Sequence, residues 1–458
     1  MFRYLLALLC FIRVTAAQDF GARFDEIKKA ATPAELYNLL WSMPKGGDLH
    51  HHASLSPYAE EWLAAALASP SNEFYTRLKF LACADSVEPF LRYQNVSRFT
   101  HGRLSECARR EYVRLQDMDP AAREAWLSSL KLDLPGEGRE EFFERVVSRM
   151  TALARDPQVF AAAMAGYIVR YGRENLRYLE TQFAPTNAVA PDGSPIDPER
   201  VIEIFRARLA EADVAGSGVV VRFQHPLIRF HPQAERTVET AYALVDRHRD
   251  LFVGINLVGR EDNDKGNAPR FLETFRKMRR KYSGIHLSIH GGEVDAPGRE
   301  VRNTLLLGAE RIGHGVNLLS DPDTMLLLRN GRNLLEINLV SNQLLEYTPD
   351  VDAHPFPEYL RFGIPVCLNT DDSGVWDSNL TDEYFTAVRR FNLSWEEVVA
   401  LGRNSLQYSF APEPVRRDRL QRLQIAVEAF EQKFKAADWR EKLTAAVPSG
   451  YARRQLLR

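Results

Sequence analysis

Histidine and acidic side chains gather in four short blocks of this 458-residue chain, which holds only 11 histidines in all. The blocks are "LHHHAS" with His50, His51 and His52, "SIHGGE" with His290 and Glu293, "RIGHG" with His314, and "LNTDD" with Asp371 and Asp372. Imidazole nitrogens and carboxylate oxygens are the usual protein ligands of Zn²⁺ and similar divalent ions. The blocks therefore offer the donor atoms of a metal centre, with acid–base groups beside them.

Eight short, mostly apolar runs alternate with stretches of helical length, and this alternation predicts an α/β fold, the (β/α)8 TIM barrel. Runs such as "GVVVRF" and "IPVCLN" are nearly continuous in apolar residues, as is typical of parallel strands buried on both faces. We expect strands over residues 46–52, 175–183, 218–224, 251–258, 285–290, 311–315, 334–339 and 364–369.

The four blocks fall at the carboxyl ends of the first, fifth, sixth and eighth predicted strands, where barrels of this class carry their active sites. Side chains alternate along a strand, so the first and third histidines of the triplet share one side and His51 faces the other. His50, His52, His290 and Asp371 then form an N3O ligand set for one divalent ion. Zinc is the obvious candidate, with one position open for water.

A metal in this set would lower the pKa of its water toward neutrality and so create a nucleophile. Glu293 follows the ligand His290 by three residues and is close enough to shuttle a proton. His314 is placed to orient or to deprotonate the water. Asp372 adjoins a ligand and is placed to hold a substrate. Each residue alone has an ordinary structural explanation, but their coincidence at four strand ends predicts a hydrolytic site.

The rest of the chain divides around this barrel. Residues 1–17 have a basic start, a short apolar run and small residues at the end, the layout of a signal peptide, which predicts a secreted or periplasmic protein. We expect an N-terminal helical segment over 18–42 and the barrel over 43–458, with further helices over about 382–446. Residues 53–174 are too long for a normal crossover and predict a helical insertion after the first strand.

The cysteines and the net charge bear on the compartment and the partners of the protein. Cys83 and Cys107 lie in one segment and are the candidate disulfide of an oxidising compartment, whereas Cys367 sits in an apolar run and is expected to be a buried thiol. The 59 Lys and Arg residues balance 61 Asp and Glu residues. This balance gives no electrostatic case for nucleic acid or an anionic membrane, and we expect no membrane attachment after signal cleavage.

The ordered blocks "MPKGGDLHHHASL", "HGGE", "ERIGHG" and "LNTDD" resemble the signature blocks of the adenosine deaminase family, in the metal-dependent hydrolase superfamily. The likeness runs from about Met43 to Asp372. Three features are more similar to the secreted, growth-factor-related branch of this family than to its compact intracellular enzymes. They are the residues "MPKGG", the signal peptide and the long insertion. The resemblance implies a purine nucleoside substrate, one Zn²⁺ per chain, and hydrolysis of adenosine and 2′-deoxyadenosine to inosine and ammonia. It also favours a homodimer, because that branch often dimerises through helical extensions.

The resemblance assigns a role to each block. It makes His50, His52, His290 and Asp371 the zinc ligands. Glu293 would give a proton to purine N1, and His314 would position the water that attacks C6. Asp372 would contact N7, and Gly259 in "INLVGRE" would offer its backbone N–H to N3. "LVSN" at 339–342 resembles a further block, in which a structural role is an equally good interpretation of Ser341 and Asn342.

One departure from the family pattern lies directly after the triplet. Many members continue with Leu-Asp-Gly, whose Asp helps to bind the 5′-hydroxyl of the nucleoside, whereas this chain has Ala53-Ser54-Leu55. Ser54 takes the place of that Asp in the predicted substrate site, but it is shorter and uncharged. How the ribose is held is therefore left open, with Trp and Tyr side chains of the insertion as another source of contacts.

Three alternative functions remain. The chain could deaminate another adenine-containing compound. It could be another amidohydrolase, which would use two metals bridged by a modified Lys at the end of strand four; the nearest lysine, Lys265, lies well beyond that strand end. It could also be a non-catalytic extracellular signalling or binding protein that keeps the fold, although the full set of predicted catalytic residues argues against this as its sole role.

Overall fold

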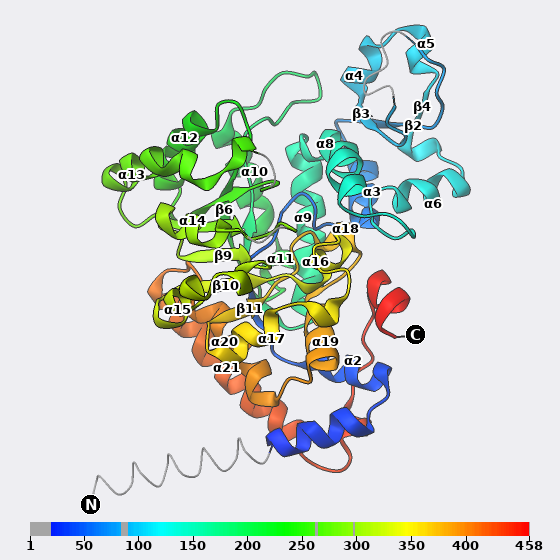
Figure 1. Cartoon of the computed structure of the whole chain (residues 1–458). Coiled ribbons are helices and arrows are strands. Elements are labelled where there is room, and N and C mark those ends of the chain that lie inside the picture. The colour runs from blue at the N-terminus through cyan, green and yellow to red at the C-terminus, as the bar shows by residue number, and fades with distance from the viewer. Residues whose placement is uncertain (1–19, 84–89, 262–263, 296–297, 458) are drawn as a thin grey trace, which may run out of the picture.

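The computed structural model describes residues 20–83, 90–261, 264–295 and 298–457, and an eight-stranded parallel sheet lies at its centre (Figure 1). The signal peptide predicted over residues 1–17 lies outside the described residues. Neighbouring strands follow the order of the chain: β1 (Gly46–Asp48), β5 (Leu176–Gln182), β6 (Val220–Ile228), β7 (Phe252–Val258), β8 (His286–Gly291), β9 (Arg311–His314), β10 (Leu334–Ile337) and β11 (Val366–Leu368). The TIM barrel and its eight predicted strands are thereby confirmed.

The first and last strands approach each other at the carboxyl end of the barrel. His51 and Asp371 form a parallel bridge there, and the Asp371 N–H donates to the carbonyl of His50 at 3.0 Å. The ladder of β1 is shorter than predicted and ends at Asp48. The ladder stops there because the N–H of the next residue, Leu49, donates to the side-chain Oδ1 of Asn369 at 3.0 Å and not to a backbone carbonyl.

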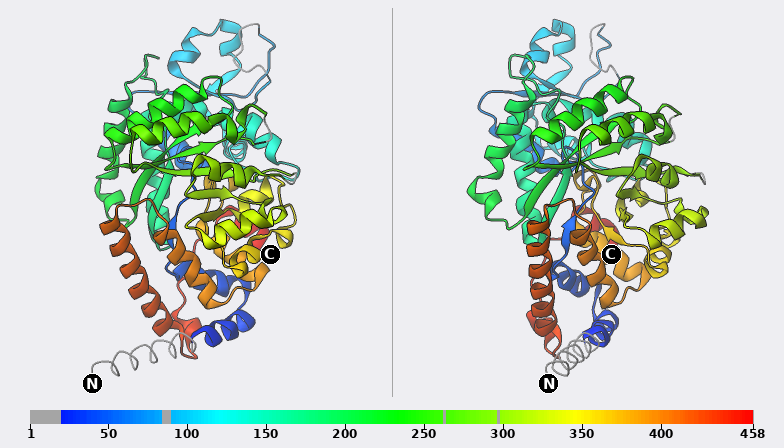
Figure 2. Two further views of the ribbon diagram at one scale, coloured as in Figure 1. Left: turned by 60° about the vertical axis from the view of Figure 1, so that its left-hand side comes forward. Right: turned by 90° about the vertical axis from the view of Figure 1, so that its left-hand side faces the viewer.

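Helices surround the sheet, as the two turned views show (Figure 2). The layer includes α9 (Pro157–Arg173), α10 (Pro198–Leu209), α12 (Ala234–Arg247), α13 (Leu272–Lys281), α14 (Glu300–Leu307), α15 (Pro322–Asn330) and α17 (Phe356–Phe362). Helix α12 shows why these segments fold so, because its buried Val238, Ala241, Tyr242 and Val245 repeat at helical spacing along one face.

The insertion between β1 and β5 contains more than helices. It holds α3 (Ala59–Ala68), α4 (Arg98–Arg103), α5 (Glu106–Arg109), α6 (Pro120–Ser128), α7 (Arg139–Glu141), the π-helical turn η2 (Phe142–Val146) and α8 (Val147–Ala154). It also holds an antiparallel sheet of β2 (Phe74–Arg77), β3 (Asn95–Ser97) and β4 (Tyr112–Arg114), which projects away from the barrel (Figure 1). The sequence did not predict this sheet, because strands of three or four residues are too short to show an alternating pattern.

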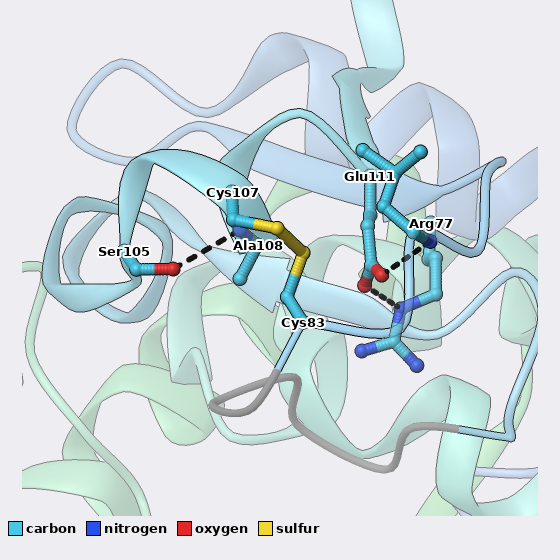
Figure 3. Close-up of a disulfide and its surroundings, with 7 residues drawn as sticks. Arg77, Cys83, Ser105, Cys107, Ala108 and Glu111 are labelled. Atoms are coloured by element: carbon cyan, nitrogen blue, oxygen red, sulfur yellow. Dashed lines mark hydrogen bonds and ion pairs between the residues drawn. A yellow bond between two sulfur atoms is a disulfide. The ribbon is translucent and has the colours of Figure 1, made fainter.

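The predicted disulfide joins Cys83 to Cys107 beside this small sheet (Figure 3). Their Cα atoms lie 5.8 Å apart, across 24 residues of sequence. The buried guanidinium of Arg77 pairs with Glu111 at 3.2 Å next to it. Among the described residues Cys367 is the free cysteine, and it is buried as expected.

Replacing Cys83 by Ser is expected to destabilise the small sheet by about 3 kcal/mol. The disulfide closes the loop between the two cysteines and so lowers the conformational entropy of the unfolded chain. Limited proteolysis should then cut the insertion faster, while the metal content stays unchanged, since the candidate metal ligands lie on the barrel. Loss of metal from this variant would contradict that separation.

The terminal segments pack against each other on one side of the barrel. Residues 20–30 are helical and precede α2 (Pro33–Ser42), in agreement with the predicted N-terminal helices. The predicted C-terminal helices are α19 (Leu380–Phe391), α20 (Trp395–Gln407) and α21 (Glu413–Phe434). Phe20 meets Trp395 edge-on at 5.0 Å, and Trp395 stacks on Phe430 at 5.2 Å. Within the described ranges, no helix combines the length and hydropathy that a membrane span requires.

Candidate active site

Four side chains converge at the carboxyl end of the barrel as the sequence predicted. One donor atom from each of His50, His52, His290 and Asp371 lies within 4.8 Å of the others. Asp371 Oδ1 is 3.1 Å from His52 Nε2 and 3.5 Å from His50 Nε2, and the Nε2 atoms of His52 and His290 are 3.3 Å apart. Asp371 takes a left-handed backbone conformation, with φ 55°, and the contacts of the closing strands hold it there.

Glu336, on β10, fixes the orientation of the His50 ring. His50 Nδ1 donates to Glu336 Oε2 at 2.8 Å, and this carboxylate also accepts from Ser288 and pairs with Arg311 Nε at 2.7 Å. Burial opposes ionisation of Glu336, but Arg311 and His50 more than offset it and hold the pKa of Glu336 below its usual range. With its proton on Nδ1, His50 turns the Nε2 lone pair toward the cluster.

A chain of amides fixes His290 in the same tautomer. Gln224 Nε2 donates to the carbonyl of Leu49, so its Oε1 is the atom that accepts from Asn256 Nδ2 at 3.2 Å. Asn256 Oδ1 is thereby left to accept from His290 Nδ1 at 2.9 Å. The Nε2 lone pair of His290 then points toward the other ligand atoms.

These donors fit a divalent ion. His50 Nε2 and Asp371 Oδ1 are buried and have no hydrogen-bond partner among the described residues. Buried nitrogen and oxygen atoms that converge in this way need a proton or a cation between them. Burial opposes protonation of His50, but Asp371 and Glu336 raise its pKa to about 10, so metal binding must displace a proton there.

His51 points away from the cluster, as strand alternation predicted. Its Nδ1 lies 2.7 Å from Thr181 Oγ1, and its Nε2 lies 3.0 Å from the Tyr171 hydroxyl. Burial lowers the pKa of His51 well below its usual value, and the charge of His52 lowers it further. His51 therefore packs the outer face of the barrel as a neutral, hydrogen-bonded residue.

Glu293 is buried at the edge of the cluster. Burial raises the pKa of its carboxyl well above the usual range, and the charges of Asp371 and Glu261 raise it further. Glu261 also shapes the turn that carries Glu293, because its carboxylate accepts from the N–H groups of Gly292 at 3.1 Å and Glu293 at 3.0 Å. Both effects favour the protonated form of this carboxyl, which can donate a proton.

His314 lies beside Glu293, with Nδ1 3.5 Å from Glu293 Oε1. Burial lowers its pKa well below the usual value, and the neighbouring His50 adds to this effect, so the ring is neutral. Its Nδ1 is also 3.1 Å from Asn338 Nδ2 and 3.0 Å from Asn342 Nδ2. The backbone at His314 has φ 65°, so the sharp turn after β9 aims the ring at the cluster.

The predicted substrate contacts lie at the same end of the barrel. Asp372 is 3% exposed, and its Oδ1 has no partner among the described residues. Burial raises the pKa of Asp372 well above its usual range, and the charge of Asp371 adds to it. Gly259 follows β7 with φ 96°, and a Cβ there would lie 2.8 Å from the Phe230 ring. Ser54 is half-buried two residues after His52.

Removing the carboxylate beneath His50 tests the metal assignment. Replacing Glu336 by Gln is expected to weaken metal binding about 10- to 100-fold, because the amide no longer holds the His50 Nδ1–H as an anionic acceptor does. Competition with a metallochromic chelator measures the effect. Glu310→Gln is the matched control, since it removes a half-buried Glu–His pair with His286 at 2.8 Å, away from the candidate ligands, and should leave metal affinity unchanged. Equal affinities in the two variants would contradict the assignment.

Sequence reasoning missed the residues that hold the ligands and the turn. Glu336 and Asn256 are single polar residues inside the otherwise apolar strands β10 and β7, and this is the signal that would have found them. Gln224 shares β6 with Arg222 and His225, so it carried no such signal. Asn342, considered only as a weak candidate, contacts His314 from the short helix α16 (Leu339–Leu344).

The insertion lies against the loops at this end of the barrel. Arg139 forms a two-pronged pair with Asp295, at 2.6 and 2.8 Å, and donates to the carbonyl of Leu345. Phe142 packs 5.1 Å from Trp376, four residues after Asp372. The insertion therefore contacts the segments that follow β8, β10 and β11, next to the candidate ligands.

Comparisons with known proteins agree with this geometry. The family model described as adenosine deaminase matches residues 101–426. Three relatives are similar: an N6-methyl-AMP deaminase of Danio rerio (30% identity over 255 residues, 54% of this chain and 71% of the relative), an adenosine deaminase of Enterococcus faecalis (28% over 254 residues, 55% and 72%) and an adenine deaminase of Cupriavidus metallidurans (28% over 316 residues, 68% and 83%).

Solved structures share the fold. The ADAL–IMP complex matches with a TM-score of 0.65 at 21% identity, over 86% of this chain and 99% of that chain. An amidohydrolase from Burkholderia ambifaria with bound Zn matches with a TM-score of 0.61 at 16% identity, over 87% and 95%. Since the family model covers more than half of the chain and the four predicted blocks meet in one buried cluster, the chain belongs to the adenosine deaminase family.

Proposed function

We propose that this protein hydrolyses the exocyclic amino group of adenosine and 2′-deoxyadenosine, giving inosine or deoxyinosine and ammonia, with one Zn²⁺ per chain. The observation that carries the proposal is a buried carboxyl, Glu293, whose pKa is raised by burial and which lies beside a three-histidine, one-aspartate cluster. His50, His52, His290 and Asp371 would hold the ion. Bound there, the ion supplies Lewis acidity that makes water a nucleophile near neutral pH.

Glu293 supplies the first proton. Protonation of N1 in the purine ring draws electrons from C6 and makes that carbon electrophilic, so the carboxyl must enter the reaction with its proton. Its burial and its acidic neighbours favour the protonated form. The water oxygen then adds to C6 and gives up its two protons, one to the N6 amino group and one that restores the Glu293 carboxyl. The C6–N6 bond breaks, and the protonated amino group leaves as ammonia.

Asp372 and Gly259 would orient the purine. N7 and N3 are both hydrogen-bond acceptors, so each needs a donor from the protein. The Asp372 carboxyl can donate to N7 because its pKa is raised by burial. The backbone N–H of Gly259 would serve N3, and its left-handed conformation favours glycine at that position.

Deamination of another adenine-containing compound is the second candidate. The relatives include proteins named as deaminases of adenosine, adenine and N6-methyl-AMP at similar identity. Ser54 also stands where many family members carry the Asp that binds the 5′-hydroxyl. Purified protein with zinc should be assayed against adenosine, 2′-deoxyadenosine, adenine, AMP and N6-methyl-AMP. The highest kcat/KM is expected for the two nucleosides, and turnover of AMP or adenine alone would replace the first candidate by the second.

We also propose an extracytoplasmic location and membership of the secreted, growth-factor-related branch, with a homodimer as the assembly. The support is the sequence of residues 1–17, the long insertion and the Cys83–Cys107 disulfide, which suits an oxidising compartment. Recovery of the mature chain, starting after Ala17, from the periplasm or medium is the expected result. Retention of an intact N-terminus inside the cell would contradict it.

A further inference from the structure

We propose that His314 acts as a neutral imidazole whose Nε2–H donates a hydrogen bond to the attacking oxygen, and that Asn342 and His354 are the positioning residues that fix this tautomer. What the hydrogen bond serves rests on the proposed function; the tautomer itself does not. The hydrogen bond orients the oxygen and moves no proton.

The fixed starting point is a backbone amide. The Phe356 N–H lies 3.1 Å from His354 Nδ1 and can only donate, so Nδ1 is an acceptor. His354 is 1% exposed, and burial lowers its pKa to about 3, so the ring is neutral. A neutral ring whose Nδ1 accepts must carry its proton on Nε2.

That proton fixes the next residue. His354 Nε2 is 3.1 Å from Asn342 Oδ1, so the Asn342 amide oxygen faces His354 and the amide nitrogen faces the other way. Asn342 Nδ2 then donates to His314 Nδ1 at 3.0 Å. Because the Phe356 N–H can only donate, these three hydrogen bonds together make His314 Nδ1 an acceptor. His314 lies beside the candidate metal ligands.

Asn338 acts in the same sense. Its Nδ2 lies 3.1 Å from His314 Nδ1 and 3.5 Å from Nε2, so the shorter contact is the donor to Nδ1. His314 therefore keeps its one proton on Nε2.

The ligand histidines are held in the opposite form. Nδ1 of His50 donates to a carboxylate, and Nδ1 of His290 donates to an amide oxygen, which frees both Nε2 lone pairs for a metal. The same end of the barrel thus holds two tautomers, one for ligation and one for donation. Of the two roles open to His314, orienting the water and deprotonating it, the neutral Nε2–H form supports the first.

Nitrogen NMR of protein labelled with ¹⁵N-histidine tests the tautomer without reference to activity. The His314 signals, identified by their loss in His314→Gln, should show an unprotonated Nδ1 and a protonated Nε2 at neutral pH. A protonated Nδ1 would overturn the proposal. Failure of the protein to turn over any nucleoside would affect the proposed function but leave this spectrum unchanged.

Asn342→Asp adds a kinetic test, because it replaces the donor to Nδ1 by an acceptor. The His314 proton should move to Nδ1, and kcat should fall about 10²-fold with KM nearly unchanged, as for loss of one donor to a reacting oxygen. Gln343→Glu is the matched control, since this neighbouring amide accepts from the Tyr451 hydroxyl instead. Wild-type kcat in Asn342→Asp, with the tautomer reversed, would overturn the role of the hydrogen bond.

A second inference rests on a different strand. We infer that Gln182, at the end of β5, hydrogen-bonds a sugar hydroxyl of the substrate and determines which sugar is accepted. This inference rests on the proposed function. Gln182 would supply a contact to the sugar that Ser54 is too short to make.

Strand alternation places the side chain of Gln182 on the inner face of the barrel. Glu180, two residues earlier, meets Arg311 inside the barrel at 2.6 Å, whereas Thr181 between them faces outward to His51. Gln182 also forms a parallel bridge with His52, so its Cα lies beside a candidate metal ligand. The side chain therefore stands one layer above Glu180, at the rim of the site.

Gln182 is 4% exposed, yet neither its Oε1 nor its Nε2 has a hydrogen-bond partner among the described residues. A buried amide without partners is unfavourable, and a ligand that supplies both a donor and an acceptor relieves it. A sugar hydroxyl does both and is uncharged, like the amide. At this position an uncharged amide therefore fits a hydroxyl better than a phosphate.

The test compares adenosine with its 2′-, 3′- and 5′-deoxy analogues in the wild type and in Gln182→Met, which keeps the length but loses the hydrogen bonds. In the wild type, the analogue that lacks the hydroxyl bound by Gln182 should have a kcat/KM about tenfold below that of adenosine. In Gln182→Met, the kcat/KM of adenosine should fall about tenfold, and that of this analogue should not fall further. Gln182→Glu, which keeps an acceptor, should lose less. Equal losses for all four substrates, or a wild type that ignores every missing hydroxyl, would overturn the inference. A wild type inactive on all four would instead refute the proposed function.

Discussion

Replacing Glu293 by Gln should lower kcat for adenosine by about 10³-fold while the protein keeps its metal. The amide has the same shape but cannot give a proton to N1, and a positioned general acid contributes on the order of 10²–10⁴ in rate. Glu293 lies outside the four-residue ligand set, so metal analysis of the variant should still return one ion per chain.

Glu273→Gln is the matched control for this result. It makes the same change on an exposed side chain of α13, where Glu273 pairs with Arg276 at 3.0 Å. Its kcat should equal that of the wild type. Survival of activity in Glu293→Gln, with metal bound, would assign the proton donor to a different group.

His52→Ala and His51→Ala should have opposite effects although the two residues adjoin. His52→Ala removes one of the four proposed ligands, so the variant should lose its metal and at least about 10³-fold in kcat/KM, since the ion would activate the attacking water. His51→Ala should keep one metal per chain. It should instead lose about 1–3 kcal/mol of stability, because Thr181 and Tyr171 lose their shared partner in a buried site.

Metal analysis and thermal unfolding of the two variants, in parallel, measure both effects. The expected pattern is metal loss in one variant and a lowered Tm with full metal in the other. Loss of metal from His51→Ala alone would show that the alternation along His50, His51 and His52 was assigned in the wrong sense.

The barrel and the convergence of the ligands were predictable from the sequence for a physical reason. Parallel strands buried on both faces give apolar runs, and a histidine or aspartate at the end of such a run stands out. The separation of His51 from its neighbours followed from the two-residue period of a strand alone. These inferences need only local pattern and the geometry of the fold class.

The supporting network was not predictable, because it depends on pairing across strands. Glu336 reaches His50 over a sequence separation of 286 residues, and Asn256 reaches His290 over 34. A polar residue within an apolar strand signals that a partner exists but does not name it. The direction of the Asn342 amide likewise depends on a backbone N–H of the next helix, which no sequence pattern reveals.

The small sheet of the insertion escaped prediction for a different reason. Its strands have three or four residues each and are stabilised by pairing with one another and by the Cys83–Cys107 disulfide. Such short strands carry too little periodicity to be separated from loops. The cysteine pair was the feature that marked this segment in the sequence.

The most direct test of the central claim is the reaction of adenosine with the zinc-loaded protein in H₂¹⁸O. The account predicts one inosine and one ammonia per adenosine, with one ¹⁸O atom in the inosine at C6, and no such turnover by the metal-free protein. Unchanged adenosine with one zinc bound per chain, or products formed equally well without metal, would contradict it.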